Sequence, residues 1–367
     1  MVRRKILILF GSIFVIGVLA VWWTNKDGLI RLRVTKQCEK CDLEMANLIA
    51  VDLTNANLSG SNLKGVDLSG ANLSGANLAE ADLTWTARFF DASDSPLIVA
   101  NLTKANLAGV NLTNANLSGA NLTNANLSGA SLARANLRGA NLSGVNLREA
   151  DLSVANLSHA KLTGAMLNGV SLAGVNLARA DLTQVNLNGV HLGGANLSGA
   201  NLTGTDLTQV NLNGVRLAGA NLTEVDLTQV NLTGANLIRV SLRYAKLRNT
   251  DLSGSNLNRA RLARANLSNA NLTGVNLSYA NLVWAKLNDI NLTGAKLKYA
   301  NLRNADISGG NLTKANLLGV DLTEANLKEV NLTGANLKYA KLNILGLVGA
   351  HFCATIMPDG AINNSSC

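Results

Sequence analysis

A large apolar residue occupies every fifth position of the chain from Leu102 to Phe352, and leucine fills almost all of these positions. A small residue, usually Ala or Val, lies two positions before each of them, and Asn or Asp usually lies between the two. A period of five suits neither an α-helix, which turns by about 100° per residue, nor a continuous strand, whose side chains alternate between two faces. The pattern instead predicts a short strand followed by a corner in every repeat.

Each five-residue repeat therefore has an inward and an outward part. The small residue and the leucine are two positions apart, so both point to one side of the strand while the Asn or Asp points to the other. The last two positions are mostly Ser, Thr, Gly and Asn, which are turn residues, and Gly readily adopts the positive φ that corners need. Strands and corners in succession close into coils, and coils stack into a parallel β-solenoid.

The repeats resemble the A(D/N)LXX signature of the pentapeptide-repeat family over most of the chain. The resemblance implies an all-β fold, a right-handed quadrilateral parallel β-helix with four repeats in each coil. The cysteine-bearing start and the Met357 to Gly360 ending are similar to those of cyanobacterial members. In this chain we expect the β-helix to be preceded by a single N-terminal apolar helix.

The repeat pattern and its interruptions divide the chain into six segments. They are an apolar anchor or signal segment (1–23), a linker and N-terminal cap (24–42), a first repeat block (43–83), an interruption (84–99), a main repeat block (100–352) and a C-terminal cap (353–367). The interruption contains Trp85, Phe89 and Phe90. We expect these aromatic residues to cover a locally irregular core; a displayed recognition loop is the alternative.

Residues 6–23 carry no charge and follow a short basic segment. Their length is at the lower limit for a membrane span, and Trp22 and Trp23 suit its interfacial end. We expect an uncleaved membrane anchor, with a signal peptide cleaved after Ala20 as the alternative. The expected location is a membrane, with the repeats on the exported (periplasmic or lumenal) side. The basic residues after the span favour the cytoplasmic face as the alternative.

All four cysteines lie near the ends of the repeats, Cys38 and Cys41 at the start and Cys353 and Cys367 at the end. Because a stack of coils separates the two pairs, one metal ion cannot bind them together. We expect two local disulfides, Cys38–Cys41 and Cys353–Cys367, which would form in an oxidising compartment and thus favour export. The alternative is that Cys38 and Cys41 are inward-facing thiols of the core.

Motifs for catalysis and for cofactor binding are missing from the sequence. The three histidines, His159, His191 and His351, have no second metal ligand nearby, and no serine or cysteine has a histidine partner at a motif spacing. The glycines mark corners and form no phosphate-binding loop. We therefore expect no enzyme activity, no catalytic residue, no metal site and no cofactor.

The net charge of +9 is concentrated between residues 238 and 303. This stretch contains eleven basic residues, and its only acidic residues are Asp251 and Asp289. When residues twenty positions apart are read as columns, many of these basic residues fall on one side of the solenoid, beside aromatic residues. The candidate interaction surface consists of Arg239, Arg243, Tyr244, Arg259, Arg261, Arg264, Tyr279, Trp284, Tyr299 and Arg303.

These observations predict a non-enzymatic structural or protein-interaction scaffold, a membrane-anchored rod with a basic and aromatic surface. The expected partners are the membrane, through residues 6–23, and a protein or an anionic membrane surface, through the candidate surface. The alternative is a nucleic-acid- or gyrase-interacting protein. Family members that shield gyrase are acidic and resemble DNA, so the basic charge disfavours mimicry. Direct binding of nucleic acid is not expected of an exported protein. The oligomeric state is left open.

Overall fold

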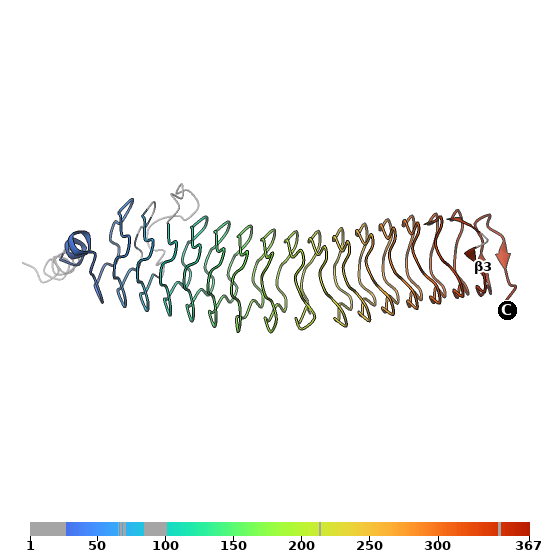
Figure 1. The fold of residues 1–367 in the computed structure, drawn as a ribbon, viewed down its shortest axis with the longest axis horizontal. Helices are drawn as coiled ribbons and strands as arrows, with labels where there is room; N and C mark the ends of the chain where they lie inside the picture. Colours follow the sequence, from blue (N-terminus) through green and yellow to red (C-terminus); the bar gives the residue numbers. More distant parts are fainter. Residues whose placement is uncertain are drawn as a thin grey trace, which may run out of the picture.

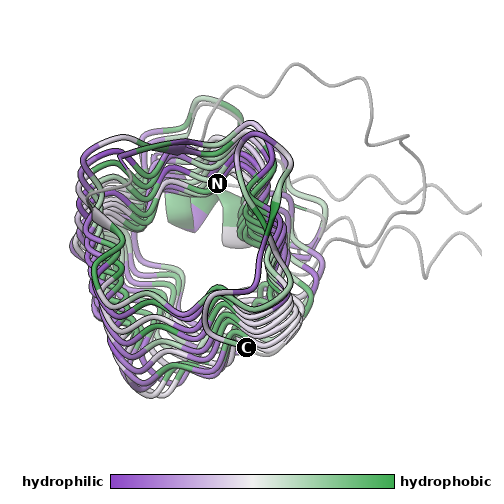
Figure 2. Ribbon diagram, turned by 90° about the vertical axis from the view of Figure 1, so that its right-hand side faces the viewer, coloured by the Kyte–Doolittle hydropathy of each residue, from purple (hydrophilic) through white to green (hydrophobic). Residues whose placement is uncertain are grey.

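The computed structural model describes residues 27–64, 66, 68, 71–83, 101–212, 214–343 and 346–367. These residues form a rod of stacked coils (Figure 1). Parallel bridges join residues twenty positions apart along most of the rod, for example Asn201 with Asn221 and Arg261 with Asn281. Four repeats of five residues therefore make one coil, and the end-on view shows a four-sided ring (Figure 2).

Each corner is a tight turn closed by the residues of the repeat itself. The N–H of Ala105 donates to the carbonyl of Leu102 at 3.0 Å, and Lys104, the third residue of this turn, has a φ of 57°. A positive φ at the third residue is typical of a type II turn. Asn101 supports the same corner, because its Oδ1 accepts the N–H of Thr103 at 3.2 Å. This contact explains why Asn or Asp precedes the leucine in nearly every repeat.

The interior of the rod is filled by the leucines and the small residues. Leu202 and Ala200 are fully buried, whereas Asn201 between them is partly exposed. The predicted inward and outward positions are thereby confirmed. Successive coils are joined through the backbone, since the N–H of Leu202 donates to the carbonyl of Asn221 at 2.8 Å and the N–H of Asn221 donates to that of Ala200 at 2.8 Å.

Paired strands occur at the C-terminal end of the described chain. β1 (Asp321–Leu322) pairs in parallel with β2 (Lys341–Leu342), and β3 (Thr355–Ile356) pairs antiparallel with β4 (Ile362–Asn363). The β3–β4 hairpin follows the last coils (Figure 1). Elsewhere in the described part, most sides of a coil contribute a single bridge to the next coil. The short elements follow from the repeat, which turns a corner every five residues.

A short helix closes the N-terminal end of the core. Residues 27–35 are helical, and the helix lies across the far end of the ring (Figure 2). The Leu32 side chain is fully buried and Leu29 packs against the core. These two apolar residues are three positions apart and therefore lie on one face of the helix. The sequence had predicted a linker and cap here, without a helix.

Disulfide bonds lie at both ends of the rod. One joins Cys38 to Cys41, whose Cα atoms are 5.3 Å apart, and the other joins Cys353 to Cys367, whose Cα atoms are 4.8 Å apart. The second bond ties the end of the tail to the last coil, where the N–H of Ser366 also donates to the carbonyl of Phe352 at 2.8 Å. Whether the bonds form in the protein's native compartment stays a prediction.

The interruption of the repeats does not end the stack of coils. Asn72 bridges Asn101, twenty-nine positions later, and Asp82 bridges Asn111 in the same way. Nine more residues than usual are thus inserted in one coil, and the coils before and after the interruption stack directly. The expectation about Trp85, Phe89 and Phe90 concerns residues that lie outside the described part.

The predicted membrane location requires correction. Among the residues that the structure describes, no helix is long and apolar enough to cross a membrane. The described helical segment, 27–35, is far shorter than the roughly 20 residues of a span and contains Arg31 and Arg33. This finding contradicts the prediction of a membrane-anchored rod with its repeats on the exported side or the cytoplasmic face. The expected apolar helix, residues 6–23, lies outside the described residues.

Candidate interaction surface

The ten residues of the candidate surface lie on one side of the solenoid, named here the arginine side. It consists of four stacked segments, 239–244, 259–264, 279–284 and 299–304, which follow one another at intervals of twenty residues. The four segments contain six arginines and no aspartate or glutamate. The structure thus brings together the residues that were predicted to share one side because they are twenty positions apart in the sequence. Their role in binding stays a prediction.

Side chains on the first corner of the arginine side stack along the rod. The guanidinium carbon of Arg259 lies 5.8 Å from the ring centroid of Tyr279. The rings of Tyr279 and Tyr299 stack with their centroids 5.5 Å apart. The Tyr299 ring then lies over Gly319, because a Cβ placed on that glycine would come within 2.6 Å of the ring. Arg259, Tyr279 and Tyr299 therefore each cover the corner of the next coil.

The second corner carries a smaller group of the same kind. The guanidinium carbons of Arg243 and Arg264 lie 5.8 and 5.9 Å from the ring centroid of Tyr244. Trp284 is one coil beyond Arg264 on this corner, and its side chain is exposed. Guanidinium groups at such distances are attracted by the electron-rich face of the ring. These contacts hold the arginines close to the surface of the rod.

The aromatic residues on these corners occupy costly backbone positions. The φ angles of Tyr244, Tyr279, Trp284 and Tyr299 lie between 56° and 62°. Glycine adopts such angles without strain, and a bulky residue rarely does. The four side chains are exposed, as is that of Tyr339 further along the first corner. They therefore add little to the core, which indicates a role at the surface.

The arginines of this side form no ion pairs with carboxylates, although the charge of Arg303 helps to lower the pKa of Asp321 in the next coil. In the described part of the chain, every ion pair involves a lysine, as between Lys36 and Asp52 or between Lys246 and Asp226. None of the six arginines of the arginine side forms such a pair. Like charges that lie close together repel one another, so a bound anion would lower the free energy of this surface.

An open, shallow hollow lies at Gly219, next to the N-terminal end of the arginine side. One part lies on the side itself, and the other lies around the first corner. Gly219 lines both parts. Four arginines border the hollow, two in each part: Arg243, Arg261, Arg239 and Arg259. The hollow is thus the place where most guanidinium groups meet.

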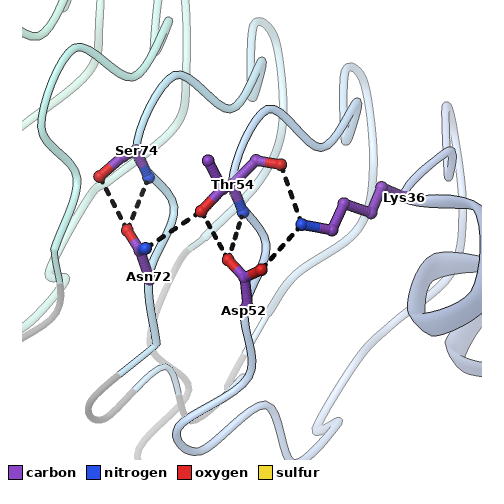
Figure 3. A network of polar contacts seen from close by, with 5 residues as sticks. All are labelled: Lys36, Asp52, Thr54, Asn72 and Ser74. Atoms are coloured by element: carbon purple, nitrogen blue, oxygen red, sulfur yellow. Dashed lines mark hydrogen bonds and ion pairs between the residues drawn. The ribbon is translucent and has the colours of Figure 1, made fainter.

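Towards the N-terminus, the same side carries a ladder of amides and hydroxyls with a few charged groups among them. Figure 3 shows its start, where Thr54 donates through its N–H and its hydroxyl to Oδ1 of Asp52, and Lys36 donates to Oδ2 of Asp52 at 2.9 Å. In the next coil, Asn72 donates to the Thr54 hydroxyl at 3.0 Å and accepts from Ser74. The Thr54 hydroxyl and the Lys36 ammonium hold the pKa of Asp52 well below its usual range. The ladder therefore satisfies its own polar groups.

The described residues offer no centre for metal chemistry. Within those parts of the chain, no group of three or more His, Cys, Asp or Glu side chains could hold a metal ion. His159 lies at a corner, and His191 and His351 lie on another side of the rod, far apart in the stack. The concentration of arginines and aromatic rings is the strongest chemical feature of the described surface.

Comparisons with known proteins identify the repeats. A family model for pentapeptide repeats matches residues 46–84, 100–214 and 216–338, in segments that together cover more than half of the chain. No curated protein sequence matches. Among solved structures, the chain is similar to HetL, a pentapeptide repeat protein involved in heterocyst differentiation regulation in the cyanobacterium Nostoc sp. strain PCC 7120. The two are 32% identical over 70% of this chain and 92% of HetL, with a TM-score of 0.24.

Two further solved structures are also similar to this chain. QnrB1, a plasmid-mediated fluoroquinolone resistance protein, is 17% identical over 59% of this chain and 94% of its own, with a TM-score of 0.20. A pentapeptide repeat protein of the Arabidopsis thaliana thylakoid lumen is 29% identical over 34% of this chain and 68% of its own, with a TM-score of 0.12.

Proposed function

Because the chain belongs to the pentapeptide-repeat family, whose fold is a right-handed β-helix, we propose that it is a non-enzymatic scaffold that binds an acidic protein through the arginine side. One observation supports the proposal above all others. Six arginines that form no ion pair share one side of a rigid rod with exposed aromatic rings. Arginine and aromatic residues are the types that dominate the binding energy of protein interfaces.

The arrangement of the rings favours a protein over a nucleic acid. Proteins that bind single strands stack bases on the open faces of aromatic rings. Here, Arg259 covers one face of Tyr279 and Tyr299 covers the other. Tyr299 is covered in turn by Tyr279 and by the corner at Gly319. The ring edges stay accessible, and they can contact the side chains of a protein partner.

A nucleic-acid- or gyrase-interacting rod is the second candidate. The net charge of +9 favours it, because phosphate backbones bind basic surfaces without regard to sequence. The charge alone does not separate the two candidates, since guanidinium groups form bidentate pairs with carboxylates and phosphates alike.

Binding measured by fluorescence anisotropy tests the proposal on the full chain. The probes are a labelled poly-L-glutamate peptide and a labelled single-stranded oligonucleotide. The first variant changes four residues of the arginine side to Ser: Arg239, Arg243, Arg261 and Arg264. The control variant removes the same charge from other sides of the rod, by changing to Ser the residues Arg216, Arg248, Lys286 and Lys296.

We expect the arginine-side variant to bind poly-L-glutamate at least about tenfold more weakly, and the control variant to change affinity by less than about threefold. Equal losses in the two variants would mean that the peptide responds to net charge alone, and the proposal would be wrong. Tight binding of the oligonucleotide without binding of the peptide would establish the second candidate instead.

A further inference from the structure

We infer that the hollow at Gly219 is the anchoring site of the arginine side and that it takes two carboxylates of an acidic peptide segment, one on each side of the corner. The inference rests on the proposed function and adds the position and chemistry of the contact. It starts from the four arginines that border the hollow. Arg243 and Arg261 lie on the arginine side, and Arg239 and Arg259 line the part around the corner.

The floor of the hollow is neutral, and its polar groups are already paired. The Thr223 hydroxyl donates to Oδ1 of Asn221 at 2.6 Å and lies 3.1 Å from the hydroxyl of Ser241. The Asn221 amide donates to the Thr203 hydroxyl at 2.9 Å in the preceding coil. The guanidinium groups above the floor are therefore the donors left for a ligand. Their planar fork of N–H groups matches the two oxygens of a carboxylate.

Gly219 keeps the hollow open by having no side chain. A Cβ built on this glycine would meet no other atom within 4 Å, although its φ is +69°. Side chains at this corner cover the next coil, as Tyr299 covers Gly319 and Arg179 approaches Gly199. A side chain at position 219 would therefore extend towards Arg239. Because glycine is found there, the space between the two pairs of arginines is free for a ligand.

The division of the hollow indicates the class of ligand. A single small anion would meet the arginines of only one part, since the corner separates the two. A segment with neighbouring Asp or Glu residues can place one carboxylate in each part and so use both pairs of arginines. The paired ring faces of Tyr279 and Tyr299 disfavour stacked bases as the occupant.

Position 219 offers a test that changes the hollow and leaves the arginines in place. The Gly219→Asp variant would place a carboxylate beside Arg239 and compete with the ligand. Gly219→Asn is the matched variant, because it has nearly the same shape without the charge and Asn tolerates a positive φ. Gly274→Asp is the charge control, since Gly274 has a φ of +68° at another corner and also has no atom within 4 Å of its Cβ position.

The probe is a labelled peptide of alternating Asp and Glu, titrated into the full chain at low salt, and thermal melting verifies that each variant folds. We expect Gly219→Asp to weaken binding at least about tenfold, and Gly219→Asn and Gly274→Asp to weaken it less than about threefold. Equal affinities of Gly219→Asp and Gly219→Asn, or an equal loss in Gly274→Asp, would overturn the inference.

The two proposals fail in different ways. If the parent chain binds the peptide and the four-arginine variant loses it, but Gly219→Asp keeps it, the arginine side binds elsewhere than in the hollow and only the inference is wrong. If the parent chain does not bind the peptide at all, the proposed function is wrong as well.

Discussion

The ring of Tyr279 stacks on the ring of Tyr299 one coil further along the rod, with an angle of 23° between the two planes. The distance between their centroids, 5.5 Å, is close to the spacing of about 4.8 Å between neighbouring strands. The spacing of the coils alone therefore brings the side chains of one corner column to stacking distance. The stack of rings ends at Gly319, whose missing side chain leaves room for Tyr299.

The first prediction concerns this end of the stack of rings. Gly319→Ala should lower the free energy of unfolding by about 1 kcal/mol more than Gly274→Ala, because the added methyl group meets the Tyr299 ring as well as the positive φ that both glycines share. In a Tyr299→Ser background, the two substitutions should cost the same. Thermal and denaturant melting of the four variants measures the difference. An excess cost that persists without the tyrosine ring would contradict the stacking.

The second prediction concerns the inward and outward positions. Leu202→Asp should lower the free energy of unfolding by about 4 kcal/mol or more, because it buries a carboxylate in an apolar core. Asn201→Asp should cost less than about 1 kcal/mol. The N–H of Thr203 and the amide of Asn221 both donate to Oδ1 of Asn201, and a carboxylate keeps that acceptor. Similar shifts of the melting midpoint in the two variants would refute the assignment.

The third prediction concerns acid stability. The Ser153 hydroxyl, followed by the Ser153 N–H, lowers the pKa of Asp151. A lowered folded-state pKa stabilises the fold above the unfolded-state value of about 3.9, and this stabilisation is lost as the pH falls through the folded-state pKa. The stability difference between the parent chain and Asp151→Asn should therefore change below about pH 4 and stay constant above it. Melting between pH 6 and pH 2.5 measures it, and a difference that is flat across this range would contradict the pKa shift.

The fourth prediction concerns the C-terminal disulfide. Replacing Cys353 and Cys367 by Ser should lower stability by about 3 kcal/mol, the effect estimated for closing a loop of about 15 residues. The amide of Ser366, which donates to Phe352, should then exchange its hydrogen much faster, while that of Leu202 should not change. Peptide mapping without reductant first shows whether the bond is present. Unchanged protection at Ser366 would mean that the tail is held without it.

Much of the fold could be predicted from the sequence, because the five-residue period acts on every repeat in the same way. The period determines that Leu202 is buried and Asn201 is outward, and the twenty-residue columns bring Arg259 and Tyr279 together. The stacking across the interruption could not be predicted in this way. The spacing of nineteen residues from Leu83 to Leu102 is not a multiple of five, yet the coils on either side stack directly, with nine extra residues in one coil.

Two other features of the structure could not be predicted from the five-residue period. The helix at residues 27–35 is short, and only the spacing of Leu29 and Leu32 gave a signal for it. The hollow at Gly219 depends on the direction in which corner side chains extend along the rod. That direction is set by the backbone at each corner, and the sequence pattern gives only the column to which a residue belongs.

Footprinting of the tyrosines with hydroxyl radicals tests the central claim most directly, because three of the four tyrosines of the chain, Tyr244, Tyr279 and Tyr299, lie on the arginine side. Tyr339 is the internal control, since it lies two coils beyond Tyr299 and outside the arginine side. With the acidic peptide bound, we predict reduced oxidation of Tyr244 and Tyr279 and unchanged oxidation of Tyr339. Equal protection of all four tyrosines, or bound peptide without protection of Tyr244 and Tyr279, would show that the arginine side is not the binding surface.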